Sequence, residues 1–101
     1  MVVQYKGEQN GIPTTFTLRI IGNNLSKSSS NYQVDLLVGD KQLPIFTTLI
    51  HLSLSNCLKE IYLFRKYNGI NFDAASEVVD PKLVPYDLVL YNTFKHGLFM
   101  A

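Results

Sequence analysis

The sequence predicts an α+β fold in which a four-stranded antiparallel meander is covered on one face by a helix near residues 48–67, followed by a C-terminal helix or strand extension. Two observations support this prediction. Apolar residues alternate with polar ones up to about residue 46, as in half-buried strands, and then recur every three or four residues, as in an amphipathic helix. Turn residues at Asn10-Gly11 and Gly39-Asp40 divide the alternating part into strands near 2–8, 13–21, 31–38 and 41–46.

The Asn10-Gly11 pair defines the register of the first hairpin. An Asn-Gly pair between alternating segments favours a two-residue type I′ turn. A turn centred there places Tyr5 opposite Phe16 and Val3 opposite Leu18. One face of the hairpin is then apolar, and we expect its residues to face the core: Val3, Tyr5, Ile12, Phe16, Leu18 and Ile20.

The second hairpin is predicted in the same way from Gly39-Asp40. A tight turn centred there places Leu36 opposite Leu43 and directs Phe46 to the outer face of the sheet. The polar residues 22–30 between the two hairpins are predicted to form a surface loop, because Gly, Asn and Ser favour turns over regular structure.

The predicted helix presents a broad apolar stripe toward the sheet. The stripe consists of Leu49 or Ile50, Leu54, Cys57, Leu58, Ile61 and Phe64. The candidate caps for the helix start are Thr47, Thr48, Ser53 and Ser55. The segment 46–54 also fits strand alternation, so a longer fourth strand stays open as an alternative. Gly69 is predicted to end the helix.

The C-terminal third carries weaker signals. Asp73 is predicted to cap a short turn through residues 74–78, and Asp80-Pro81 is a second start signal. Residues 86–91 are rich in strand-forming side chains and are predicted as a strand, although the charges near the two ends of this region also suit a helix. We expect the apolar tail 98–100 to pack on the body of the protein.

Composition limits the classes of function. The chain has 101 residues, 47% of them hydrophobic, so we expect one compact domain, residues 1–101. Its net charge is +1 and the sequence contains no basic block for phosphate contacts. Cys57 is the only cysteine, which rules out an intramolecular disulfide and suits a reducing compartment. The sequence shows neither an apolar leader nor a membrane-spanning stretch, so we expect a cytoplasmic protein without membrane association.

Candidate catalytic chemistry is sparse. His51, Ser53 and Ser55 lie close in sequence, but neither a glycine elbow nor a clearly placed orienting carboxylate accompanies them. His51, Cys57 and His96 do not match the spacing of a zinc site, and the glycines do not form a phosphate loop. We therefore predict no catalytic, cofactor-binding or metal-binding residues. A small enzyme with a site near His51 or His96 is the third alternative.

The predicted function is protein binding. The aromatic end of the helix cannot bury every large side chain against one sheet, and tyrosine and arginine are frequent in binding hot spots. The residues predicted to contact a protein partner or a second copy of the chain are Tyr62, Leu63, Arg65, Lys66, Tyr67 and Phe99. The small size, together with the many residues that have AT-rich codons, suggests an accessory regulator or inhibitor from a virus, a phage or another mobile element.

A single-stranded nucleic-acid binder is the second alternative. A four-stranded sheet followed by a helix is also the element order of some dimeric single-strand-binding transcription cofactors, which is an analogy of topology alone. Base stacking needs exposed aromatic side chains in a positive groove. In the predicted register Phe46 is the only aromatic residue on the outer face, so nucleic-acid binding is not favoured.

Overall fold

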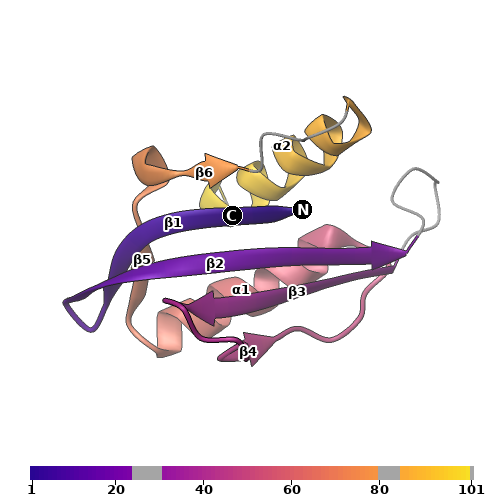
Figure 1. The fold of residues 1–101 in the computed structure, drawn as a ribbon. Coiled ribbons are helices and arrows are strands. Elements are labelled where there is room, and N and C mark those ends of the chain that lie inside the picture. The colour runs from indigo at the N-terminus through magenta and orange to yellow at the C-terminus, as the bar shows by residue number, and fades with distance from the viewer. Residues whose placement is uncertain (24–30, 80–84, 101) are drawn as a thin grey trace.

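The computed structural model describes residues 1–23, 31–79 and 85–100, and it confirms the predicted α+β fold with an antiparallel meander (Figure 1). Within these residues the helices and strands are β1 (Val2–Gln9), β2 (Ile12–Asn23), β3 (Asn31–Val38), β4 (Phe46–Thr47), α1 (Leu54–Tyr67), β5 (Ile70–Phe72), the 3₁₀ helix η1 (Ala74–Ser76), β6 (Val78–Val79) and α2 (Pro85–Met100).

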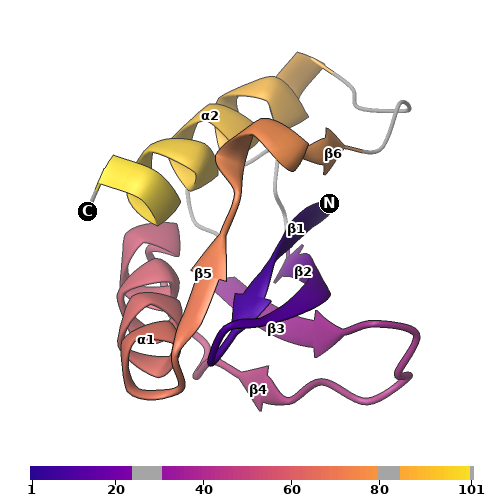
Figure 2. The same ribbon diagram turned by 90° about the vertical axis from the view of Figure 1, so that its left-hand side faces the viewer.

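The six described strands form one sheet in the order β4-β3-β2-β1-β5, and β6 also pairs with β1. The helix α1 covers one face of the sheet, and α2 packs against α1 and lies beside β6 (Figure 2). The short strands β5 and β6 are additions to the predicted meander. Both pair with β1 on the side away from β2, so β4 lies at the opposite edge of the sheet.

The first hairpin has the predicted register. Tyr5 pairs with Phe16, and both residues of the Asn10-Gly11 turn have positive φ angles, 51° and 81°, as a type I′ turn requires. The residues of its inward face are buried with one exception. Ile12 was predicted to face the core and is 68% exposed, because it pairs with Gln9 at the turn end, where the hairpin extends past the core cluster.

The predicted register of the second hairpin is wrong. Leu36 pairs with Phe46 instead of Leu43, and the fourth strand is only Phe46–Thr47 instead of 41–46. The connection from Gly39, whose φ is 57°, is therefore longer than a tight turn. Because the shift is an odd number of residues, Phe46 lies on the face that α1 covers and not on the outer face.

The predicted helix start near residue 48 is also wrong. α1 begins at Leu54, after the extended residue Ser53 with φ −121° and ψ 129°. The preceding residues are not helical because two of them bond to β3: the Thr48 amide donates to the Val34 carbonyl over 3.0 Å, and His51 forms a bridge with Tyr32. The alternative of a longer fourth strand is also wrong, because β4 ends at Thr47 and only an isolated bridge at His51 follows it before α1.

The consequence is that only part of the predicted apolar stripe faces the core. Leu54, Cys57, Leu58 and Ile61 are buried and Phe64 is half-buried, as predicted. Leu49 and Ile50 are instead 71% and 66% exposed. The predicted helix end is confirmed, because Gly69 follows the C-cap residue Asn68 with a φ of 63°.

The C-terminal third contains one confirmed and one wrong prediction. The Asp73 carboxylate accepts the amide N–H of Ala75 over 3.0 Å and caps η1. The predicted strand at 86–91 is wrong, because these residues belong to α2. Helical spacing brings both Phe94 and Leu98 into the core, which confirms that the apolar tail packs on the body. The loop predicted at 22–30 is wrong at its start, because residues 22 and 23 pair with β3 as the end of β2. Residues 24–30 and Asp80-Pro81 lie outside the described residues.

The core between the sheet and the helices contains a cluster of aromatic rings. Tyr5 stacks on Phe72 and meets Phe99 edge-on, each with ring centroids 5.4 Å apart. Gly97 of α2 approaches α1 so closely that a Cβ atom there would lie 2.5 Å from Cδ1 of Leu58.

Neither helix, over its described residues, has the length and apolar content that crossing a membrane requires.

Candidate functional site

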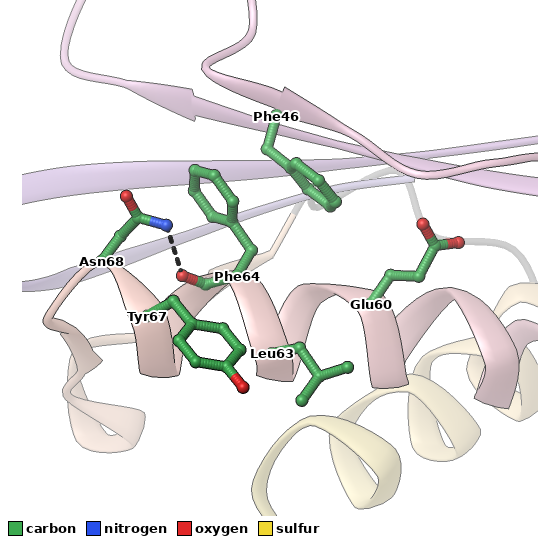
Figure 3. Close-up of a pocket in the computed structure, with 6 residues that line it drawn as sticks. All are labelled: Phe46, Glu60, Leu63, Phe64, Tyr67 and Asn68. Carbon is green, nitrogen blue, oxygen red and sulfur yellow. Dashed lines mark hydrogen bonds between the residues drawn. The ribbon is translucent and has the colours of Figure 1, made fainter.

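A hollow of about 270 Å3 lies between β4 and the C-terminal half of α1 (Figure 3). Phe46 reaches from β4 toward the helix, where its ring stacks on Phe64 with centroids 4.4 Å apart and planes 18° from parallel. This stack forms one wall of the hollow. The six residues that line the hollow are Phe46, Glu60, Leu63, Phe64, Tyr67 and Asn68.

Leu63 and Tyr67 form the outer rim of the hollow. They are one helical turn apart on α1, so their side chains are neighbours on the helix surface. Leu63 is 48% exposed and Tyr67 is 79% exposed. At the helix end, the Asn68 side-chain amide donates to the Phe64 carbonyl over 2.8 Å, which holds the last turn beside the hollow. The rim is therefore apolar, accessible and carried on a regular helix.

Glu60 is the only acidic residue that lines the hollow, and its carboxylate is engaged within the chain. It pairs with Nε2 of His51 and accepts the amide N–H of Leu49 over 3.2 Å. These contacts tie the extended segment before α1 to the helix itself. This pair is not predictable from the sequence, because the nine-residue separation of His51 and Glu60 has no fixed geometry until the tertiary fold is known.

Further apolar side chains are exposed along the chain around β4. Leu43 and Leu52 are each 79% exposed, in addition to Leu49 and Ile50. Exposed apolar side chains are typical of an interaction surface where they form a contiguous patch. Their sequence signal was the strand-like alternation through 46–54, which the predicted helix stripe obscured.

The predicted contact residues separate into two groups. Tyr62 is 46% exposed, Lys66 is exposed, and both lie on α1 with the rim residues of the hollow. Arg65 and Phe99 instead make contacts within the chain.

The Arg65 guanidinium lies 4.1 Å from the ring centroid of Phe72, and its Nη1 donates to the Leu98 carbonyl over 3.4 Å. Burial lowers the pKa of this guanidinium, although nearby Tyr5 and Tyr62 raise it. Its Nε atom is buried without a hydrogen-bond partner. We therefore interpret Arg65 as a packing contact between α1, β5 and α2.

Among the residues considered for catalysis, His51 has a carboxylate partner, Glu60, which the sequence did not predict. The His51–Ser55 spacing would place both side chains on one helix face, but α1 begins only at Leu54. Cys57 is fully buried, burial raises the pKa of its thiol, and its Sγ donates to the Tyr32 carbonyl over 3.3 Å. Within residues 1–23, 31–79 and 85–100, His, Cys, Asp and Glu side chains form no group of three that could hold a metal ion.

The outer face of the sheet is polar along its centre. Asp35 is 4% exposed there and accepts hydrogen bonds from Arg19 over 2.8 Å and from Gln33 over 3.2 Å. Phe46, the one aromatic residue predicted on this face, lies on the opposite face beside Phe64. The described strands therefore present no aromatic ring on the outer face.

The hollow can accept an apolar side chain, because its walls are two stacked rings and its rim is a leucine and a tyrosine. The lining residues include no cysteine, serine or histidine that would act as a nucleophile or base. Comparisons with protein-family models, curated proteins and solved structures find no match to this chain.

Proposed function

We propose that this chain is a small non-enzymatic protein that acts by binding another protein through the hollow and the exposed side of α1. The observation that carries this proposal is the pairing of exposed Leu63 and Tyr67 with a hollow of about 270 Å3 whose far wall is the Phe46–Phe64 stack. An exposed apolar rim beside a preformed concave surface is typical of a protein contact.

The contacts that hold this surface in place also support the proposal. Leu63 and Tyr67 project from a regular helix, and the stacked rings and the His51–Glu60 pair hold the adjacent extended segment against it. A preorganised surface loses little conformational entropy when it binds. The edge position of β4 adds backbone groups that a partner strand can pair with.

A regulatory or inhibitory role in the cytoplasm of a host cell, for a virus, phage or other mobile element, is part of the same proposal. It is supported by the small size of the chain and by its composition. The partner in this proposal is a different protein or a second copy of the chain.

Nucleic-acid binding is the less favoured function. Single strands are bound by stacking bases on exposed aromatic rings within a positively charged groove. The position of Phe46 under α1 removes the one aromatic residue that the outer sheet face was predicted to offer. An enzymatic role is the least favoured, because the Cys57 thiol is buried and its raised pKa disfavours the reactive thiolate.

A site-specific crosslink tests the proposal. The photoreactive residue p-benzoylphenylalanine replaces Tyr67 in one protein and Val78, which is 60% exposed on β6, in a matched control. Both are irradiated in extract of the source cells, and adducts are identified by mass spectrometry. We expect a nuclease-resistant protein adduct at position 67 that is absent at position 78.

The experiment is repeated with Leu63→Asp added to the Tyr67-substituted protein. This substitution replaces the leucine of the rim with a charged residue, and we expect the adduct to disappear. Because Leu63 is half exposed, this variant should lose less than about 1 kcal/mol of stability, which urea unfolding checks. Adducts that contain only nucleic acid, or protein adducts equal at both positions, would contradict protein binding at this surface.

A further inference from the structure

The charge on the exposed side of α1 points to the chemistry of the partner. We infer that the occupant of the hollow is an acidic segment of another protein, which inserts one bulky apolar side chain between Phe46 and Leu63 and places carboxylates against Lys59 and Lys66. This inference rests on the proposed protein-binding function and adds to it the class of partner.

The two lysines flank the apolar rim. Lys59 lies four residues before Leu63 and Lys66 lies three residues after it, so both are its neighbours on the helix surface. Both lysines are exposed, as are Tyr62 and Tyr67 beside them. The two lysines therefore lie one turn before and one turn after Leu63 on the exposed side of α1, next to the rim of the hollow.

The same helix offers no free carboxylate to balance these lysines. Glu60 is the only acidic residue in α1, and it is engaged with His51 and with the Leu49 amide. The exposed side of α1 is thus cationic and apolar at once, although the whole chain has a net charge of only +1. Complementary charge around an apolar anchor raises the association rate and selects among partners.

Two other occupants fit these observations less well. Nucleic-acid phosphates would pair with Lys59 and Lys66, but two lysines release few counterions and the apolar hollow makes no use of a phosphate. In a two-fold dimer formed by this surface, each copy would bring its own lysines toward those of the other, since such an interface uses the same patch twice. An acidic apolar segment avoids both conflicts.

A peptide-display selection tests this inference on the intact protein. Immobilised wild-type chain selects from random linear dodecapeptides displayed on phage. We expect the enriched sequences to carry Asp or Glu on both sides of a Leu, Ile, Met, Phe or Trp residue. A synthetic peptide of the enriched sequence is then measured by fluorescence anisotropy at low and high salt, where higher salt should weaken binding.

Charge-reversed variants make the test specific. We expect the double variant Lys59→Glu/Lys66→Glu to lower the affinity for the acidic peptide by about tenfold or more. The same variant should bind more tightly a peptide whose carboxylates are replaced by lysines. Lys6→Glu, an exposed reversal on β1, is the control and should change affinity by less than about twofold.

Several outcomes would overturn the inference, and they are distinguishable from failure of the proposed function. Enriched peptides that need Leu63 but are neutral or basic, and do not respond to the lysine reversal, would refute the acidic partner while leaving protein binding in place. The acidic partner would also be refuted if no linear peptide is enriched. It would likewise be refuted if a short labelled oligothymidine competes with the peptide for the protein, or if sedimentation shows a dimer that depends on Leu63. Loss of the position-67 crosslink would refute the function itself.

Discussion

Phe46 and Phe64 stack with ring centroids 4.4 Å apart, although they lie on a two-residue edge strand and on the helix that covers the sheet. The contact joins β4 to α1 across the edge of the core. It also forms the wall of the hollow opposite Leu63 and Tyr67. The same pair of rings therefore stabilises the edge of the fold and shapes the candidate binding surface.

Replacing Phe46 tests this contact and the observed strand register together. We expect Phe46→Ala to lower the free energy of unfolding by about 2 kcal/mol, because it removes a half-buried ring and its stacking partner. Phe46→Leu, the matched control, should cost less than half as much. Urea unfolding followed by circular dichroism measures both. A loss below about 0.5 kcal/mol for Phe46→Ala would indicate an outward-facing ring, as in the tight-turn register.

Asp35 should make stability depend on pH. Burial alone raises the pKa of this carboxyl, but hydrogen bonds from Arg19, Gln33 and Thr47 outweigh burial, so its pKa lies below the ordinary 3.8. The folded state therefore favours the carboxylate, and the stabilisation is present above pH 3.8 and is lost as the pH falls through this value toward the lower folded pKa.

Comparison with Asp35→Asn isolates this effect from other groups that titrate in acid. We expect the variant to be less stable than wild type by about 1–2 kcal/mol near neutral pH, and the difference to shrink at about pH 3. Glu8→Gln, a change of an exposed carboxylate on β1, is the matched control. A difference between wild type and Asp35→Asn that stays constant across this range would contradict the assigned hydrogen bonds.

Gly7 should be intolerant of any side chain, because β5 packs directly against it. A Cβ atom at Gly7 would lie 2.0 Å from the backbone oxygen of Asn71, so the strands would have to separate. We expect Gly7→Ala to cost about 2–3 kcal/mol in urea unfolding. Gly11→Ala, with a φ of 81° and open space around it, should cost only about 1 kcal/mol of backbone strain. A neutral Gly7→Ala would contradict the pairing of β1 with β5.

Cys57 should be unreactive in the folded protein. It is fully buried, and burial raises the pKa of its thiol, so little thiolate is available. We expect labelling by a colorimetric disulfide reagent to be about 100-fold slower than in urea-unfolded protein. The fast-reacting control is the double variant Cys57→Ala/Ser55→Cys, whose single cysteine occupies an exposed position of α1. Equally fast labelling of native and unfolded Cys57 would support a reactive site and weaken the non-enzymatic proposal.

The parts of the fold that depend on local geometry were predictable. The Asn10-Gly11 turn and the alternation on either side of it determine the register of β1 and β2, since a two-residue turn leaves one pairing that keeps Tyr5 and Phe16 together. Gly69 ends α1 and Asp73 caps η1 for similarly local reasons. In the candidate site, the exposure of Tyr62, Leu63 and Tyr67 followed from the width of the apolar stripe.

Long-range contacts decided the remainder. The segment 48–53 satisfies helical and extended patterns alike, and its backbone bonds to Val34 and Tyr32 select the extended form. Residues 86–91 have strand-forming side chains, yet they are part of a helix that also brings Phe94 and Leu98 into the core. The helix propensities of ordinary residue types differ by roughly fractions of a kcal/mol per residue, so the packing of side chains in the core overrides them.

The sequence by itself determined the α+β class, the antiparallel order of the first strands, and a helix with an aromatic, partly exposed end. Only the tertiary structure decided that Phe46 faces α1, that Glu60 holds His51, and that Arg65 and Phe99 are used within the chain. The physical reason is one of range. Turns and periodicity act over a few neighbouring residues, whereas the hollow is formed by residues from a strand and a helix whose relative position depends on the whole core.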